Sequence, residues 1–229
     1  MLMHILTLQP LLLTLKVASL ATLFSFLVGV AVAALLSRGR FPGRDWLDAF
    51  LTLPLVLPPT VLGYYLIVLL GRNGWLGWWL DETLGISLMF TWQGAVVAAA
   101  VVSLPLTFKG ARAALEGVDP TLEKAARTLG ASEWGVFWRV SFPLAWRGIL
   151  AGAMLAFARA MGEFGATLMI AGNIPGKTQT LSLAVYDAVQ AGHDSLAATL
   201  VIITSLVCIL VLVSCGKILK TSYLKEVDR

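Results

Sequence analysis

Charged residues are scarce in this chain: aspartate, glutamate, lysine and arginine together make up 13% of its 229 residues. A typical soluble domain carries about twice that share. Hydrophobic residues make up 58% of the chain, and the mean hydropathy is +0.84. So few charges cannot cover a globular surface with solvated side chains, which excludes an ordinary soluble domain. The composition is that of an integral membrane protein.

Cysteine and histidine are also scarce, with two of each. Cys208 and Cys215 lie seven residues apart in one apolar segment, too far apart on a helix to bond with each other. His4 and His193 have no second ligand at metal-site spacing. We therefore expect no disulfide, no metal and no cofactor bound by this chain. The absence of a catalytic constellation argues against a membrane-embedded enzyme. The net charge of +4 is not gathered in a basic stripe with aromatics, so no nucleic-acid partner is expected.

Long apolar runs are abundant, and five of them reach the roughly 20 residues that a helix needs to cross a bilayer. The first is expected to be retained, because residues 1–10 carry no lysine or arginine and the run is too long for a signal peptide. We expect an all-α integral membrane protein, one domain over residues 1–229, built as a polytopic bundle of about five or six spanning helices. The five expected spans are Leu11–Leu36, Leu47–Leu70, Ser87–Phe108, Gly148–Ala171 and Ala197–Gly216.

Positive charge is distributed unevenly between the two sides of these spans. With the N-terminus outside and the C-terminus in the cytoplasm, the outer loops hold only Arg72 and Lys177, while Lys16 and Arg159 lie within spans. The remaining thirteen lysines and arginines are cytoplasmic in this orientation, as the positive-inside rule requires. They are Arg38, Arg40, Arg44, Lys109, Arg112, Lys124, Arg127, Arg139, Arg147, Lys217, Lys220, Lys225 and Arg229.

Proline indicates where the spans bend or break. Pro54, Pro58 and Pro59 lie in the second expected span and Pro105 in the third, and each removes a helical hydrogen bond. Such breaks are tolerated in a membrane where they are buried in protein or line a cavity. They favour a moving, pathway-forming bundle over a passive anchor. After the fourth span, residues 178–192 are amphipathic but too short to cross, which predicts a re-entrant or outer-face helix.

Residues 116–143 form a long polar segment between two apolar runs, and their sequence predicts two short helices in the cytoplasm. Asp119 is a natural N-cap with Pro120 in the first turn, and Gly130 suits a left-handed C-cap. Ser132 is expected to open a second helix that ends at Pro143. An apolar stripe at helical spacing is formed by Leu122, Ala125, Ala126 and Leu129. The stripe either lies flat on membrane lipid or docks a soluble partner. The two alanines favour docking, because they anchor poorly in lipid but allow close approach.

Two charges lie inside the fourth expected span, where Arg159 and Glu163 are one helical turn apart beside Gly162 and Gly165. A charge at this depth is costly and usually faces protein or a wet pathway. The preferred interpretation is an ion pair that neutralises itself inside a helix interface. The alternative is that Arg159 presents positive charge to a passing anion. The glycines would let another helix approach or let this helix flex.

Residues 171–178, AGNIPGKT, satisfy a relaxed phosphate-loop pattern. A phosphate loop needs a strand before it and a helix after it, so that backbone amides face the phosphates. This segment follows a spanning helix on the outer side, away from cytoplasmic ATP. We interpret it as a turn leaving the membrane.

Three stretches of the chain resemble the molybdate permease subunits of ABC importers. They are residues 41–71, residues 114–132, which contain LEKAARTLGAS, and residues 157–186. In the cytoplasmic motif of these permeases, two alanines, a glycine four residues later and a downstream proline mark a coupling helix. Lys124 stands where that motif usually has glutamate, and Glu123 lies one position earlier.

The resemblance implies a type I importer permease in a bacterial cytoplasmic membrane. It implies a homodimer served by a soluble oxyanion-binding protein and by two cytoplasmic ATPase subunits, which would bind the ATP and Mg²⁺. The ATPase-docking residues it implies are Leu122, Glu123, Ala125, Ala126, Leu129 and Gly130. Sulfate, thiosulfate and tungstate permeases share much of the pattern. An ion-coupled secondary transporter is the rival class, but no internal repeat supports it.

Overall fold

The computed structural model describes residues 2–39 and 42–227, with side chains for 7–39, 42–214 and 216. Some of the residues discussed above lie outside the described side chains: His4, Arg40, Cys215, Lys217, Lys220, Lys225 and Arg229. The described residues form helices and no strand, which confirms the all-α class. The helices are α1 (Leu2–Arg38), α2 (Arg44–Val56), α3 (Pro59–Leu70), α4 (Trp75–Leu84), α5 (Trp92–Glu116), α6 (Pro120–Thr128), α7 (Glu133–Val136), the π-helical turn η1 (Phe137–Ser141), α8 (Phe142–Met161), α9 (Gly165–Ala171), α10 (Leu181–Gln190) and α11 (Asp194–Val227).

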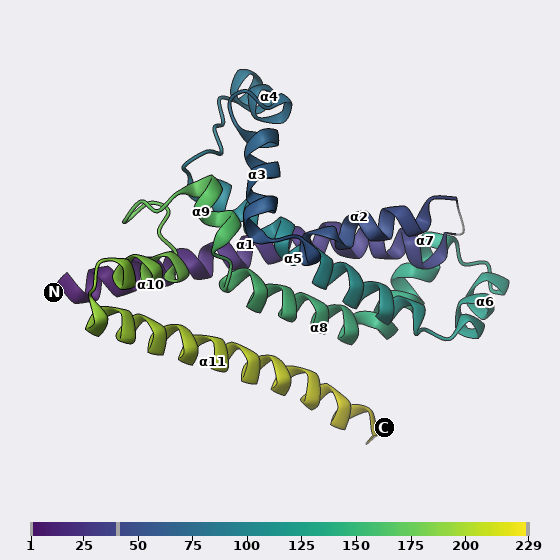
Figure 1. The fold of residues 1–229 in the computed structure, drawn as a ribbon. Helices are drawn as coiled ribbons and strands as arrows, with labels where there is room; N and C mark the ends of the chain where they lie inside the picture. Colours follow the sequence, from purple (N-terminus) through teal and green to yellow (C-terminus); the bar gives the residue numbers. More distant parts are fainter. Residues whose placement is uncertain (1, 40–41, 228–229) are drawn as a thin grey trace.

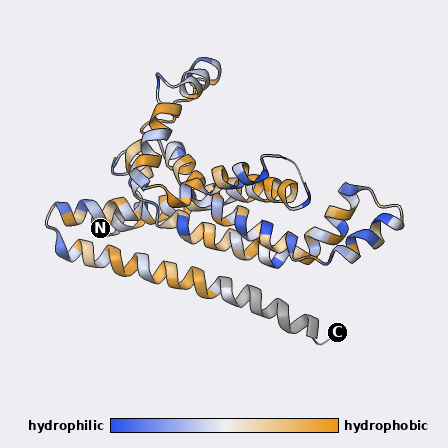
Figure 2. Cartoon of the chain, turned by 45° about the vertical axis from the view of Figure 1, so that its right-hand side comes forward, coloured by the Kyte–Doolittle hydropathy of each residue, from blue (hydrophilic) through white to orange (hydrophobic). Residues whose placement is uncertain are grey.

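Four segments of the described chain are long and apolar enough to cross a membrane. They are Thr7–Arg38, Trp92–Glu116, Glu133–Met161 and Asp194–Ser214, and a fifth span is reached if α2 and α3 count as one. Figure 1 shows α1, α5, α8 and α11 running side by side, with α6 beyond one end of the bundle. Figure 2 shows hydrophobic residues along these helices and hydrophilic ones gathered toward the α6 end. The first, third and fifth expected spans are confirmed, with shifted ends.

The second expected span, Leu47–Leu70, is broken rather than continuous. Helix α2 ends at Val56, Leu57 is extended with ψ 140°, and α3 begins at Pro59 with a bend of 115° between the two. Pro58 supplies no N–H and disfavours a helical Leu57, so the helix cannot continue there. Pro54 and Pro105 lie inside α2 and α5, which continue through them.

The fourth expected span, Gly148–Ala171, starts earlier than predicted and is broken, although its predicted end at Ala171 is also the end of α9. Helix α8 ends at Met161, and α9 starts at Gly165 after a three-residue gap. At its N-terminal end the helix runs on from Glu133, so Pro143 does not end it as predicted. Instead the backbone widens into η1 just before Pro143, which then lies in the first turn of α8, where a missing N–H is tolerated.

Small residues bring α5 and α8 close together in the bundle. A Cβ added to Gly110 would lie 2.7 Å from the Cα of Gly152, and one added to Gly148 would lie 2.5 Å from the Cβ of Ala114. Each helix thus presents two small residues four positions apart, the pattern that lets membrane helices pack backbone to backbone. This contact holds α8 against α5 near the α6 end of the bundle (Figure 1).

Candidate docking surface and transport pathway

The polar segment folds locally as its capping residues predict. The Asp119 carboxylate accepts a hydrogen bond from the Thr121 N–H at 2.8 Å, and Pro120 occupies the first turn of α6. Gly130 follows the helix with φ +86°, a conformation that glycine adopts without strain. The Ser132 hydroxyl accepts from the Gly135 N–H at 3.2 Å and opens α7. The predicted helix starts after Asp119 and Ser132, and the left-handed glycine at 130, are confirmed.

The apolar stripe of α6 remains uncovered by the described part of the chain. Leu122 is 48% and Leu129 is 88% exposed, and Ala125 and Gly130 are exposed as well. Ala126 is half-buried against the rest of the protein. Large apolar side chains exposed on a short helix at the end of the bundle are unfavourable in water, so they indicate a surface that another molecule covers.

Glu123 lies on the inner side of α6, away from the exposed stripe. Its carboxylate accepts a hydrogen bond from Arg38 of α1 at 2.9 Å and another from the Ser141 hydroxyl of η1. Arg127 adds an ion pair with Glu133 at 2.6 Å. These contacts tie α6 to the C-terminal ends of α1 and η1, so α6 is held as part of the bundle rather than as a free loop.

Burial raises the pKa of the Glu123 carboxyl, but the Ser141 hydrogen bond and the Arg38 charge lower it by more, and the net shift is downward. The carboxylate form is therefore favoured in the folded protein. Its stabilising contribution is complete above the ordinary glutamate pKa and is lost as the pH falls through the lowered value.

A hollow of about 380 Å³ continues the stripe toward the membrane. It opens between the ends of α5, α6 and α8, and Leu122 forms one wall. Its remaining lining is mostly small or apolar: Ala113, Ala114, Gly117, Val118, Asp119, Leu144, Ala145 and Gly148. The exposed stripe and this hollow form one continuous surface with room for an inserted side chain.

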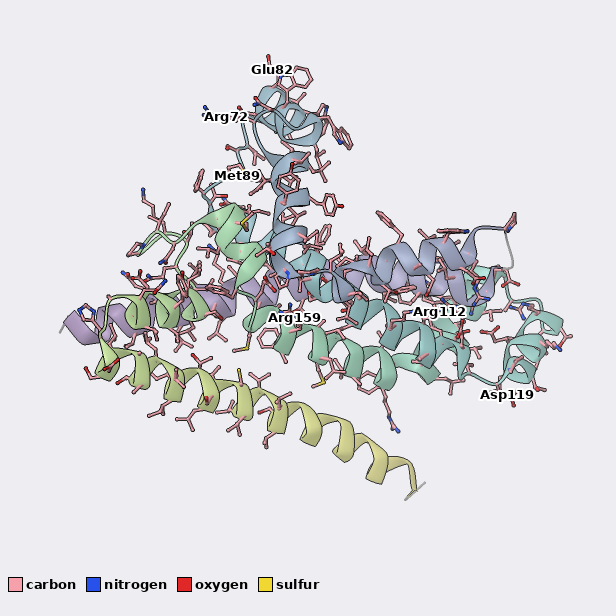
Figure 3. The ribbon with its side chains drawn as sticks, viewed as in Figure 1. Arg72, Glu82, Met89, Arg112, Asp119 and Arg159 are labelled. Atoms are coloured by element: carbon pink, nitrogen blue, oxygen red, sulfur yellow. The ribbon has the colours of Figure 1, made fainter. Side chains whose placement is uncertain are left out.

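Arg159 and Glu163 form the predicted ion pair, with the Arg159 Nη1 2.9 Å from the Glu163 Oε2. The Glu163 side chain is 2% exposed, and its other oxygen accepts the Ala166 N–H at 2.8 Å. This carboxylate therefore bridges the break between α8 and α9. The Arg159 side chain is 33% exposed, so part of this side chain is open to the surroundings of the bundle (Figure 3).

The two helix breaks lie against each other. A Cβ added to Gly165, at the start of α9, would lie 2.6 Å from the Cβ of Pro59, at the start of α3. Likewise, a Cβ added to Gly63 of α3 would lie 2.7 Å from the Cβ of Met169 in α9. Gly162, in contrast, is exposed within the break, and an added Cβ would meet only backbone oxygens at 3.9 Å. Of the two glycines predicted beside the charges, Gly165 permits the close approach, whereas Gly162 lies at the break itself.

Residues 172–180 form a turn after α9, as expected, and not a phosphate loop. Helix α9 precedes them and no strand does. The Ile174 N–H donates to the Thr178 hydroxyl at 3.0 Å, and the Gln179 amide donates to Asn173 at 3.0 Å. The backbone N–H groups of Lys177, Thr178 and Gln179 all donate to the Ile174 carbonyl. These amides are therefore used within the turn and do not converge on an open anion site.

Two features of the site were not predicted from the sequence. The pairing of Arg38 with Glu123 joins residues 85 positions apart, and no local pattern signals it. The close contact of α5 with α8 had a signal, because Gly148 and Gly152 are spaced as membrane helix-packing glycines are.

An all-helical bundle of spanning helices, with paired breaks beside an embedded charge pair and an uncovered helix at one end, defines a membrane transport permease. The sequence pattern of the family described as "binding-protein-dependent transport system inner membrane component" matches residues 25–222, and the chain belongs to that family.

Similar proteins agree with this assignment. The chain is 53% identical over 197 residues to the molybdenum transport system permease protein ModB of Escherichia coli K12, covering 86% of each chain. It is 41% identical over 177 residues to the sulfate transport system permease protein CysT of the same organism, covering 77% of this chain and 64% of the relative. An inward-facing structure of the MetNI methionine ABC transporter shares the fold with a TM-score of 0.70 at 19% identity, over 94% of this chain and 95% of the other.

Proposed function

We propose that this chain is the permease subunit of an ATP-driven importer for an oxyanion, and that the oxyanion is molybdate. The main observation in support of an ATP-driven transporter is the uncovered apolar stripe of α6 at the end of the helix bundle. The choice of molybdate rests on the relative with 53% identity. Sulfate is the second candidate, favoured by the sulfate permease relative. The test is ATP-driven uptake by the purified complex, with molybdate and sulfate compared as substrates.

In this proposal an ATPase subunit covers α6, with Leu122, Ala125, Ala126, Leu129 and Gly130 as the contact surface. Glu123 acts from the other side of the helix and passes movements of α6 to α1 and η1 through Arg38 and Ser141. Closure of two ATPase subunits would then rotate two permease copies about their interface, a rigid-body change. ATP and Mg²⁺ would be bound by the ATPase subunits, and this chain would perform no chemistry.

The pathway is proposed to run beside the paired breaks, with Arg159 as the cation that attracts the oxyanion. Glu163 holds the guanidinium in place while the exposed part of Arg159 faces the passing anion. Both breaks meet at the contact of Gly165 with Pro59, so relative movement of α3 and α9 would open or close the route next to this charge. A soluble oxyanion-binding protein would deliver the substrate from the outer side.

The proposed orientation places α6 in the cytoplasm of a bacterial cell and the 172–180 turn outside. We expect a cysteine at Lys177 to react with a membrane-impermeant maleimide applied to spheroplasts, and one at Lys124 to react only after permeabilisation. Both positions are exposed, so side-chain burial does not decide the result. Cys208 and Cys215 are replaced by alanine in both variants. Labelling at Lys124 in intact spheroplasts would contradict the orientation and the docking of a cytoplasmic partner.

A further inference from the structure

A groove runs between α1 and the stretch of chain from α7 to the start of α8, two parts of the bundle that lie side by side (Figure 1). The hollow that forms it has a volume of about 450 Å³. Its lining on α1 falls at helical spacing on one face and consists of Leu27, Ala31, Ala34 and Arg38. The two alanines leave space that larger side chains would fill. The groove therefore has a floor of small residues and a charged residue at its α6 end.

The opposite wall of the groove is aromatic. Its rings form one cluster, with neighbouring centroids 5.1 to 6.2 Å apart, made of Trp134, Phe137, Trp138 and Phe142. The π-helical turn η1 builds this wall, because the Phe142 N–H donates to the Phe137 carbonyl five residues earlier and the wider turn brings both rings to one side. Trp134 is 72% and Trp138 is 47% exposed. Tryptophan is typical of the level at which spanning helices meet the water interface.

A second hollow, of about 420 Å³, adjoins the first. The two hollows share Phe26 and Phe142, and the second continues along α8 past Trp146 to Leu150. Its lining residues are all apolar or aromatic. Two apolar lobes that meet at shared residues fit the two acyl chains of one diacyl lipid.

The length of the groove matches one leaflet of a bilayer. Residues 26–38 of α1 line the first hollow from end to end, which at about 1.5 Å per residue is about 18 Å. Half of a hydrocarbon core of about 30 Å is about 15 Å. A groove of this length reaches from the interface at the α6 end to the middle of the membrane, as an acyl chain does.

The α6 end of the groove carries a cation with unused donors. The Arg38 Nη2 donates to Glu123 at 2.9 Å and also to Ser141, whereas its Nε and Nη1 have no hydrogen-bond partner among the described residues. The Arg38 side chain is 25% exposed and lines the hollow. An arginine with free N–H groups at the end of an apolar groove complements a phosphate group.

We propose that this groove binds one phospholipid from the leaflet on the α6 side, with the phosphate on Arg38 and the two acyl chains in the two hollows. In the proposed orientation this is the cytoplasmic leaflet. Because Arg38 also holds Glu123 of α6, the bound lipid contacts the side chain that positions the docking surface. The inference goes beyond the proposed function and does not depend on which ion is carried.

The test is native mass spectrometry of the complete transporter, extracted in mild detergent, which counts the phospholipids retained per permease copy. Ala31→Trp places an indole in the groove. Leu35→Trp is the matched control, because Leu35 is on the same helix, is 61% exposed and lines neither hollow. We expect one retained phospholipid per copy in the unsubstituted complex and in the control, and its loss from Ala31→Trp. Equal retention in all three complexes, or none in any, would overturn the inference.

A second variant covers the case in which Ala31→Trp does not assemble. Trp138→Ala removes part of the aromatic wall without adding bulk, and it should also lose the retained lipid. Retention at the unsubstituted level in Trp138→Ala would then overturn the inference. A small membrane protein that co-purifies in place of the lipid, and that is lost with the same variants, would assign the groove to a protein helix and would likewise overturn it.

The phosphate contact is tested with delipidated complex. Phosphatidylethanolamine and a diacylglycerol with the same acyl chains are titrated in parallel, and binding is followed by native mass spectrometry. The diacylglycerol should bind roughly tenfold more weakly, the loss expected for a charge-assisted hydrogen bond. Equal binding of the two lipids would contradict the placement of the phosphate on Arg38.

Discussion

Replacing Ala125 by aspartate is expected to release the ATPase subunits while the permease still inserts in the membrane. Ala125 lies at the centre of the exposed α6 stripe, and it is preferable to the half-buried Ala126 because its own chain does not contact it as closely. Docking would bury the new carboxylate without a partner, at a cost of about 3 kcal/mol or more. That corresponds to more than a hundredfold weaker association.

The measurement is co-purification of the ATPase subunits in mild detergent, quantified per permease. Lys124→Asp is the control, because it introduces an aspartate at an exposed position outside the apolar stripe, about 100° around the helix from Ala125. We expect the control to retain its ATPase subunits. Normal co-purification and uptake with Ala125→Asp would show that the stripe is not the docking surface, and would favour the membrane-surface interpretation of α6.

Removing the charge pair separates a structural role of Arg159 from a role in the pathway. Arg159→Met alone leaves the Glu163 carboxylate, 2% exposed, with only the Ala166 N–H as a partner. Stranding a buried charge costs roughly 3–5 kcal/mol, so we expect poor assembly of this variant. In Arg159→Met/Glu163→Gln no charge is stranded, and the glutamine oxygen can still accept the Ala166 N–H. The double variant should therefore assemble.

Transport by the double variant decides between the two roles. If Arg159 attracts the oxyanion, uptake per assembled complex should fall at least tenfold, about 1.4 kcal/mol, although thermal unfolding and ATPase binding stay near normal. Uptake close to that of the unsubstituted complex would leave Arg159 with the structural role alone. Glu163→Gln by itself is the control, since it keeps the guanidinium in the pathway.

Local sequence patterns predicted the parts of the site that depend on neighbouring residues. Asp119, Pro120 and Gly130 each set backbone geometry within one or two positions, and their predicted roles in α6 are confirmed. The composition likewise predicted the helical membrane class. The clustering of charges on one side predicted an orientation that remains to be tested by labelling.

Contacts between distant segments could not be predicted in the same way. Pro58 indicated a bend in the second span. The size of that bend, 115°, depends on the packing of α3 against α9 through Pro59 and Gly165, which the sequence does not show. A hydropathy pattern predicts a continuous fourth span through Gly162–Phe164. It contains no information on the hydrogen bond by which the Glu163 carboxylate caps a new helix at that point. The mistaken helix end at Pro143 has a different cause, since a π-helical turn shifts the hydrogen-bond register just before the proline.

The central claim is that this chain forms the pathway of an ATP-driven oxyanion importer. Its most direct test is molybdate uptake by proteoliposomes that contain the permease with its ATPase subunits, with ATP inside and the binding protein and molybdate outside. The claim predicts uptake that requires both internal ATP and the binding protein, that exceeds sulfate uptake, and that is lost with Ala125→Asp. Uptake driven by a proton or sodium gradient without ATP would contradict it and would place the chain among secondary transporters.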